Sequence, residues 1–228
     1  MISNLEFLEI LPSIQQACIK AGKMQKKYHK TDIDISTKAN KTPVTKIDID
    51  SNIIISDMLK KITPNIPIIS EEDYEGQDRH DSFWIVDPLD GTRNYLDKGN
   101  NFCICISLIK ESYPILGIIY SPVKDYFYYA YHGCGAFLMR GANNPIKIQT
   151  SKMSKDKNNV FTSISINKSI LKQISVHVEN ALFVKLASAL KFGAIASGEG
   201  CFYPRLGPTH EWDTAAGQCL IEEAGGSV

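Results

Sequence analysis

The sequence has no excess of either charge. Its 25 lysines and arginines are balanced by 25 aspartates and glutamates, so the formal net charge is zero. A chain without a net positive field has no general attraction for nucleic acid or anionic lipid, and we expect neither as a partner. An electrostatic function of this chain therefore depends on where its charges gather.

The chain also lacks a long apolar run, a CxxC pair and a His/Cys spacing of the zinc type. Stretches such as Ile115–Tyr120 are far shorter than the roughly 20 residues of a membrane-spanning helix, so we expect no integral membrane segment. The amino terminus has acids where a secretory signal needs bases. We expect a cytoplasmic protein, with peripheral association at the cytoplasmic face of the inner membrane as the alternative. Reduced, mostly buried thiols are expected at Cys18, Cys103, Cys105, Cys134, Cys201 and Cys219.

Two helices precede any sheet in the first half of the chain. Apolar residues recur at three- and four-residue steps over Leu8–Tyr28, which predicts a long helix with Pro12 in its first turn. Thr45 can cap a second helix that ends before Pro64. Short apolar runs separated by turn residues then predict an antiparallel meander. Its expected strands are Ile68–Ile69, Phe83–Val86, Phe102–Ile109, Ile115–Tyr120, Tyr126–Tyr131 and Ala136–Met139.

The second half of the chain predicts a mixed α/β arrangement. A polar connection over Lys152–Asn159 divides an amino-terminal α+β half, residues 1–150, from a carboxy-terminal α/β half, residues 151–228. The second half stops at Val228 where a strand begins, so we expect a truncated carboxyl terminus. Its expected strands are Val160–Ile166, Leu182–Val184 and Cys201–Tyr203. Its expected helices are Ser169–Asn180, Ser188–Ala196 and Trp212–Ala224.

An aspartate pair at the end of a buried strand is the first candidate for chemistry. Asp87 and Asp90 stand three residues apart in DPLDGT, and Gly91 permits close backbone approach. Both carboxylates and the Leu89 carbonyl can converge, and such hard oxygen ligands favour Mg²⁺ or Mn²⁺ over zinc. The N–H groups of Gly91 and Thr92 open a turn or helix start that can bind phosphate. A solvated turn without a ligand is the alternative for an isolated motif.

Two further acidic motifs follow the same logic. Glu71 ends another buried strand, and Asp213 lies at the start of a helix that begins near Glu211. Alone, the first fits an exposed acidic loop and the second an acid-rich helix start. Together with the aspartate pair they predict clustered acids whose mutual repulsion divalent cations offset.

These motifs resemble those of the inositol monophosphatase superfamily, which are magnesium-dependent, lithium-sensitive phosphatases. Residues 87–95, DPLDGTRNY, are similar to the family's first signature, and residues 212–217, WDTAAG, to its second. Ser70-Glu71-Glu72 and Val44–Asp48 resemble two shorter upstream motifs, and all four occur in family order. The resemblance covers nearly the whole chain. It implies an α+β or α/β fold, the layered α/β/α/β/α sandwich of the inositol monophosphatase and fructose-1,6-bisphosphatase type.

The resemblance also implies a set of metal ligands. Glu71, Asp87 and the Leu89 carbonyl would hold one Mg²⁺, and Asp87, Asp90 and Asp213 a second. Mn²⁺ is a possible substitute, and Li⁺ is expected to inhibit.

The same resemblance implies three catalytic residues. Glu71 would position the nucleophilic water, and Thr92 with Asp48 would accept its proton as a hydroxyl–carboxylate pair. A third, weaker Mg²⁺ would lie near Glu71 and Asp48.

The second half resembles one branch of the family, the bacterial 3′(2′),5′-bisphosphate nucleotidases of sulfur assimilation. The segment Tyr203–Thr209 carries this likeness, together with Ser188–Phe192. It implies 3′-phosphoadenosine 5′-phosphate as the substrate, which is hydrolysed to AMP. It also implies that Ser188, Lys191 and Arg205 bind the nucleotide. The expected substrate contacts are Leu89, Asp90, Gly91, Thr92, Ser188, Lys191, Arg205, Glu211 and Asp213.

Alternatives stay open for the substrate. Lys191 also fits a snorkelling surface lysine, and Arg205 a structural salt bridge. Gly198–Phe202 departs from the branch pattern and His210 stands in a variable slot, so the sequence leaves adenine recognition open. An inositol or sugar-phosphate phosphatase is the alternative enzyme, and an inactive nucleotide-binding protein is the alternative of another class. The resemblance suggests a monomer or homodimer.

Overall fold

The computed structural model describes residues 4–31, 35–37, 43–76 and 80–228. The helices are α1 (Asn4–Tyr28), α2 (Lys46–Ile62), α3 (Thr92–Leu96), α4 (Lys168–His177), α5 (Leu190–Ala196) and α6 (Glu211–Glu223). In the part of the chain that is described, no helix has the length and apolarity needed to cross a bilayer.

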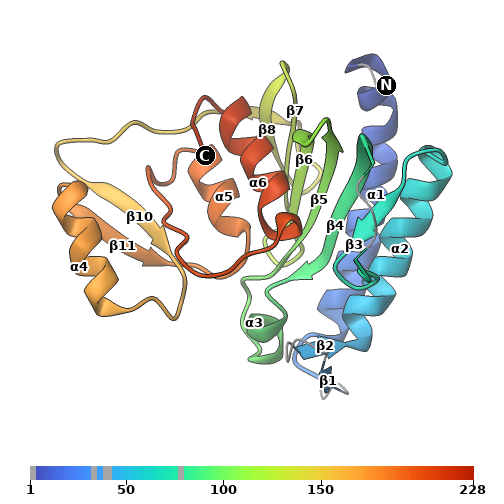
Figure 1. Ribbon diagram of the computed structural model, residues 1–228, viewed down its shortest axis with the longest axis horizontal. Coiled ribbons are helices and arrows are strands. Elements are labelled where there is room, and N and C mark those ends of the chain that lie inside the picture. Colours follow the sequence, from blue (N-terminus) through green and yellow to red (C-terminus); the bar gives the residue numbers. More distant parts are fainter. Residues whose placement is uncertain (1–3, 32–34, 38–42, 77–79) are drawn as a thin grey trace.

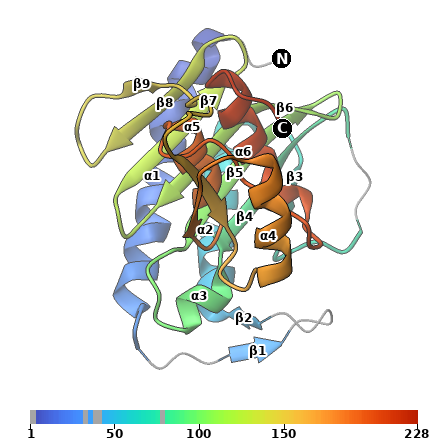
Figure 2. The same cartoon turned by 90° about the vertical axis from the view of Figure 1, so that its left-hand side faces the viewer.

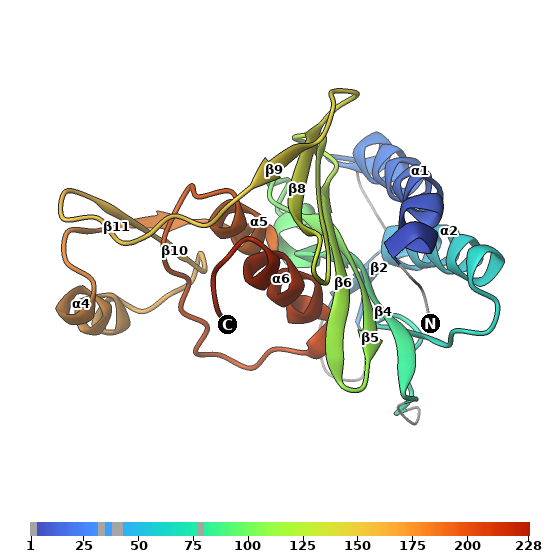
Figure 3. The ribbon, with the colours of Figure 1, turned by 90° about the horizontal axis from the view of Figure 1, so that it is seen from above.

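Helices and sheets alternate in layers (Figures 1 and 3). Helices α1 and α2 cover one face of a seven-stranded sheet, and α5 and α6 cover the other face. Beyond α5 lies a parallel two-strand sheet, and α4 covers its outer side. This α/β/α/β/α order confirms the predicted fold class.

The large sheet contains β3 (Ile68–Ser70), β4 (Ser82–Asp90), β5 (Cys103–Lys110), β6 (Tyr113–Ser121), β7 (Tyr126–Tyr131), β8 (Gly135–Arg140) and β9 (Ile146–Ile148), paired in that order. From β4 to β9 every pair is antiparallel, so the meander prediction is confirmed for β4 to β8. It is wrong for β3, which pairs parallel with β4. Parallel pairing requires the chain to return to the same end of the sheet between Ser70 and Ser82, so no hairpin turn joins these two strands.

The remaining strands show what the sequence patterns missed. They are β1 (Ile35–Thr37), β2 (Pro43–Thr45), β10 (Asn158–Thr162) and β11 (Ala181–Lys185). The predictions omitted β1, β2 and β9. The short helix α3, which Figure 2 shows beside the β1–β2 pair, begins at Thr92, where the sequence predicted a turn or helix start. Strand β10 begins inside the predicted connection and ends before Ser163, and Phe202 makes a single bridge to Val160 where a full strand was predicted.

The first helix extends further back than predicted. Pro12 lies inside α1 instead of in its first turn. An interior proline costs a helix roughly 3 kcal/mol, but the residues before it gain tertiary contacts. The Phe7 ring is buried and stacks on Tyr131 with ring centroids 4.8 Å apart. Packing against the sheet therefore holds the extra turns.

The start of the second helix confirms the predicted cap. Thr45 Oγ1 accepts a hydrogen bond from the Ile47 N–H at 3.1 Å, and the Thr45 N–H donates to Asp48 Oδ2 at 2.8 Å. This reciprocal arrangement is a capping box, and α2 ends at Ile62, before Pro64, as predicted.

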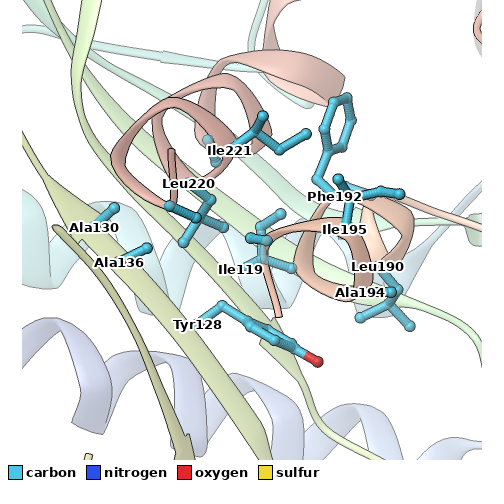
Figure 4. Close-up of a cluster of buried hydrophobic side chains, with 14 of the residues drawn as sticks. Ile119, Tyr128, Ala130, Ala136, Leu190, Phe192, Ala194, Ile195, Leu220 and Ile221 are labelled. Atoms are coloured by element: carbon cyan, nitrogen blue, oxygen red, sulfur yellow. The ribbon is translucent and has the colours of Figure 1, made fainter. Parts of the chain in front are cut away.

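Helices α5 and α6 pack closely on the sheet. Figure 4 shows Phe192, Ile195 and Leu220 of these helices over Ile119 and Tyr128 of the strands. This packing sets the position from which α6 begins.

We expect Gly117→Ala to destabilise the protein by roughly 1–3 kcal/mol, because overpacked sites force the backbone apart. A Cβ atom on Gly117 of β6 would overlap the carbonyl oxygen of Ala216 in α6. Urea unfolding measures the effect. Gly207→Ala is the matched control, since nothing lies within 4 Å of a Cβ atom there. Equal unfolding midpoints for the two variants would contradict the expectation.

Candidate functional site

A cavity of about 540 Å³ opens where the three acidic motifs meet. It is bordered by the end of β4, the turn into α3, the first residues of α5 and α6, and the loops after β10 and β11. Four acids line one side: Glu71, Asp87, Asp90 and Asp213. Lys191, Tyr203 and Arg205 also line it, so the cavity holds both signs of charge.

Parallel pairing brings the first two acids together. Ser70 of β3 is the register partner of Val86 in β4, and the next residues in each strand are Glu71 and Asp87. The Glu71 N–H donates to the Val86 carbonyl at 3.0 Å, which continues the ladder into the site. Side chains of adjacent residues in parallel register point the same way, so the two carboxylates lie side by side.

The start of α6 supplies the third acid. Asp213 Oδ2 accepts hydrogen bonds from the His210 N–H at 3.0 Å and from Thr209 Oγ1 at 2.8 Å. Trp212 is buried in a cluster that includes Ile69 and Ile85 of the sheet, which anchors this end of the helix. One carboxylate oxygen from each of Glu71, Asp87 and Asp213 lies within 4.8 Å of the other two.

The fourth acid lies at an irregularity in β4. The register with β5 shifts between Asp87 and Asp90, and Asp90 Oδ2 accepts a hydrogen bond from the Ala189 N–H at the start of α5. Gly91 follows with φ of +93°, a left-handed conformation that favours glycine. A Cβ atom on Gly91 would come within 3.3 Å of the Ser188 Cβ. Because Gly91 has no side chain, this turn can bring Asp90 into contact with Ala189 at the start of α5.

Burial and nearby negative charges raise the pKa values of Asp87 and Asp90. The Asp87 carboxyl is 2% exposed, and burial first, then the neighbouring Glu71, Asp90 and Asp213, raises its pKa well above 3.8. Burial and the Asp213 charge raise the pKa of Asp90 to about 6. A divalent cation would remove this repulsion, and donors that are all carboxylate or carbonyl oxygens suit hard ions such as Mg²⁺. The residues present therefore fit a divalent metal centre.

A hydroxyl–carboxylate pair borders the acids. Thr92 Oγ1 lies 3.0 Å from Asp48 Oδ1 and 3.1 Å from the Leu89 carbonyl, so its proton can be donated to either acceptor. Thr92 lines the cavity and Asp48 lies behind it, 1% exposed. Burial raises the pKa of Asp48, while hydrogen bonds from Thr45 and Thr92 oppose the rise. The pair can pass a proton between the cavity and a buried carboxylate.

The basic residues differ in burial. Lys191 is 4% exposed, and its Nζ donates to the carbonyls of Leu186 at 3.1 Å and Ser188 at 2.5 Å. The ammonium also lies 5.0 Å from the centre of the Tyr203 ring, and burial lowers its pKa. It is therefore not a snorkelling surface lysine. Arg205 is exposed, and one of its N–H groups donates to the Pro208 carbonyl at 2.6 Å.

The structure places most of the predicted site residues around this one cavity. Besides those described above, Leu89 and Ser188 line it. Glu211 is the exposed first residue of α6 and, like Asp48, is not among the described residues that line the cavity.

The sequence analysis missed several lining residues. Ser163 and Ser165 follow β10, and the cavity reaches the end of β11 as well. Ligands commonly bind at the carboxyl ends of parallel strands. The strand–helix–strand pattern over 158–185 could therefore have predicted that the loops after these two strands line the cavity. His210, which the sequence placed only in a variable slot, lines the cavity and stacks on Trp212 with ring centroids 4.6 Å apart.

Known proteins resemble this chain in sequence and in fold. A model of the inositol monophosphatase family matches residues 7–228. The 3′(2′),5′-bisphosphate nucleotidase CysQ of Buchnera aphidicola subsp. Acyrthosiphon pisum is 37% identical over 232 residues, covering 100% of this chain and 86% of that protein. Its namesake from Escherichia coli is 35% identical over 199 residues, covering 86% and 79%. The solved structure of CysQ from Bacteroides thetaiotaomicron has a TM-score of 0.80 at 27% identity, covering 97% and 89%.

We expect the metal-free protein to lose stability as pH rises from about 4 to about 7. The pKa of Asp90 is about 6 in the folded protein against an ordinary 3.8, so the folded state binds more protons than the unfolded chain in this window. The raised pKa of Asp87 acts in the same direction. Melting temperatures in a chelator should fall by several degrees across the window, and Mg²⁺ should restore them most at the higher pH.

Asp90→Asn should flatten this pH dependence, because asparagine does not titrate. Asp57→Asn, at an exposed position of α2, is the matched control and should keep the wild-type slope. A wild-type melting temperature that rises steadily with pH in the chelator would contradict the assignment.

Proposed function

The chain belongs to the inositol monophosphatase family, and on that premise we propose that it is a metal-dependent phosphomonoesterase that hydrolyses 3′-phosphoadenosine 5′-phosphate to AMP and phosphate. The observation that carries the proposal is the pairing, in one cavity, of clustered carboxylates with Lys191 and Arg205. The acids suit a metal-dependent phosphatase, and the bases suit a substrate with a second phosphate.

The acidic side of the cavity would hold the metal. Glu71, Asp87 and the Leu89 carbonyl are assigned to one Mg²⁺, and Asp87, Asp90 and Asp213 to a second. Divalent ions bound there would polarise the phosphoryl group of the substrate and would lower the pKa of a metal-bound water. Mn²⁺ would substitute for Mg²⁺, and Li⁺ would inhibit.

The proton acceptor would be the pair of Thr92 and Asp48. Thr92 faces the cavity and already contacts the Asp48 carboxylate, so a proton from water held by Glu71 has a hydrogen-bonded route away from the phosphate. Asp48 together with Glu71 is assigned to a third, weaker Mg²⁺.

The basic side would hold the phosphate that is not cleaved. Arg205 uses one of its five N–H donors on Pro208, which leaves donors for a bidentate phosphate contact. The Lys191 ammonium donates to the backbone carbonyls of Leu186 and Ser188, which fixes the position of its positive charge. An inositol monophosphate has no second phosphate to use these groups. A cavity of about 540 Å³ also lies in the range of small-molecule sites.

The remaining assignments follow from the same family branch. The partner is a small-molecule substrate, and the protein acts in the cytoplasm as a monomer or homodimer. Glu211, exposed at the start of α6, is assigned to the substrate-binding rim.

Substrate choice tests this function. In Mg²⁺, we expect phosphate release from 3′-phosphoadenosine 5′-phosphate to exceed release from adenosine 3′-monophosphate and from inositol 1-phosphate. Arg205→Met should raise KM for the bisphosphate by roughly tenfold or more, the worth of one charged hydrogen bond, with little change for adenosine 3′-monophosphate. Faster turnover of the inositol ester would instead support the alternative, an inositol or sugar-phosphate phosphatase.

The metal assignment has its own test. Asp90→Asn removes one charge from the cluster without changing shape, so we expect weaker Mg²⁺ binding by calorimetry and turnover reduced by several orders of magnitude. Asp57→Asn again serves as the control. Near-normal turnover of Asp90→Asn at limiting Mg²⁺ would refute the role assigned to Asp90.

A further inference from the structure

Two cysteines of β5 lie against the acidic side of the cavity. Cys103 is the register partner of Asp90, and Cys105 is the partner of Asp87. Cysteines two apart on a strand point to the same face, so both thiols face the β4 carboxylates. Both are at most 1% exposed, and neither is part of the proposed phosphatase chemistry.

Two of the three distances within this group match those of a tetrahedral thiolate site. Cys103 Sγ lies 3.6 Å from Asp90 Oδ2 and 3.9 Å from Cys105 Sγ. All three ligand atoms lie within 4.8 Å of one another. A tetrahedral zinc with Zn–S bonds of about 2.3 Å and Zn–O bonds of about 2.0 Å separates two sulfurs by about 3.8 Å and sulfur from oxygen by about 3.5 Å. The side chains therefore need little movement to close on such an ion.

We propose that Asp90, Cys103 and Cys105 form a binding site for a thiophilic divalent cation of the zinc class. Two soft sulfurs select such an ion over Mg²⁺, whereas the neighbouring Glu71 and Asp213 offer only hard oxygens. Asp90 lines the cavity, so an ion reaches the thiols from there, and a water in the cavity completes the four ligands. Both thiols release their protons to solvent when the ion binds.

The site overlaps the proposed magnesium centre through one residue. Asp90 cannot serve both ions fully, so a zinc-class ion on the thiols withdraws a carboxylate from the phosphatase. The enzyme would then be inhibited by thiophilic ions at concentrations well below those of Mg²⁺. This inhibition rests on the proposed function, whereas binding to the thiols does not.

Cobalt is the spectroscopic probe for the site. Co²⁺ added to the reduced, metal-free protein should produce a sulfur-to-cobalt charge-transfer band in the near ultraviolet with one ion per chain. Co²⁺ held by Glu71, Asp87 and Asp213 alone has no sulfur ligand and produces no such band. A wild-type protein without the band overturns the proposal, whatever its activity.

Cysteine variants locate the ligands. Cys103→Ala/Cys105→Ala should abolish the band, and Cys103→Val or Cys105→Val alone should remove roughly half of it. Valine fills the space of the cysteine side chain, so the single variants still test the proposal if the double alanine variant does not fold. Cys219→Ala, at another buried thiol in α6, is the matched control and should keep the full band. A band that survives in either folded single variant at full strength also overturns the proposal.

Inhibition by Zn²⁺ provides the functional readout. At fixed Mg²⁺, the Zn²⁺ concentration for half-inhibition should rise tenfold or more in each valine variant and stay at the wild-type value in Cys219→Ala. Unchanged inhibition in the valine variants, with the cobalt band reduced as expected, would reject the overlap with the phosphatase while leaving the thiol site intact. A protein with the band but no phosphatase activity would reject the proposed function instead.

Discussion

Repulsion among clustered carboxylates is the interaction on which the rest of this structure depends. Glu71, Asp87, Asp90 and Asp213 meet in one cavity, and Asp87 is buried away from the water that would screen its charge. The raised pKa of Asp87 shows how unfavourable its charged form is there. Acids stay in such an arrangement only when rigid elements carry them, and each of these acids stands on a strand, at its end, or in the first turn of a helix. The layered packing that holds α6 against β6 is thus also what holds the charges together.

The proposed chemistry divides along the hardness of the donors. Asp87 groups with the carboxylate oxygens of Glu71 and Asp213, while Asp90 groups with the sulfurs of Cys103 and Cys105. Asp90 therefore stands between an oxygen-rich and a sulfur-rich environment. Lys191, held by carbonyls in the same cavity, adds the positive charge that an anionic substrate needs.

Much of the fold followed from local patterns because local energies decide those features. The capping box at Thr45 and the stop before Pro64 depend on residues within one helical turn. The position of Pro12 did not follow, because stacking of Phe7 on Tyr131, far along the chain, outweighs the local cost of the proline. Long-range packing overrides propensity wherever the two compete.

The site shows the same division between local and long-range effects. DPLDGT and WDTAAG by themselves pointed to Asp87, Asp90 and Asp213, which the structure brings to one cavity. Gly91 in the first motif predicted a close backbone approach, since backbone sterics act within a few residues. Only the tertiary structure decided that β3 runs parallel to β4, which sets Glu71 beside Asp87. It alone placed Cys103 opposite Asp90. Strand direction and register are selected by packing of whole layers, a free energy that no short stretch of sequence contains.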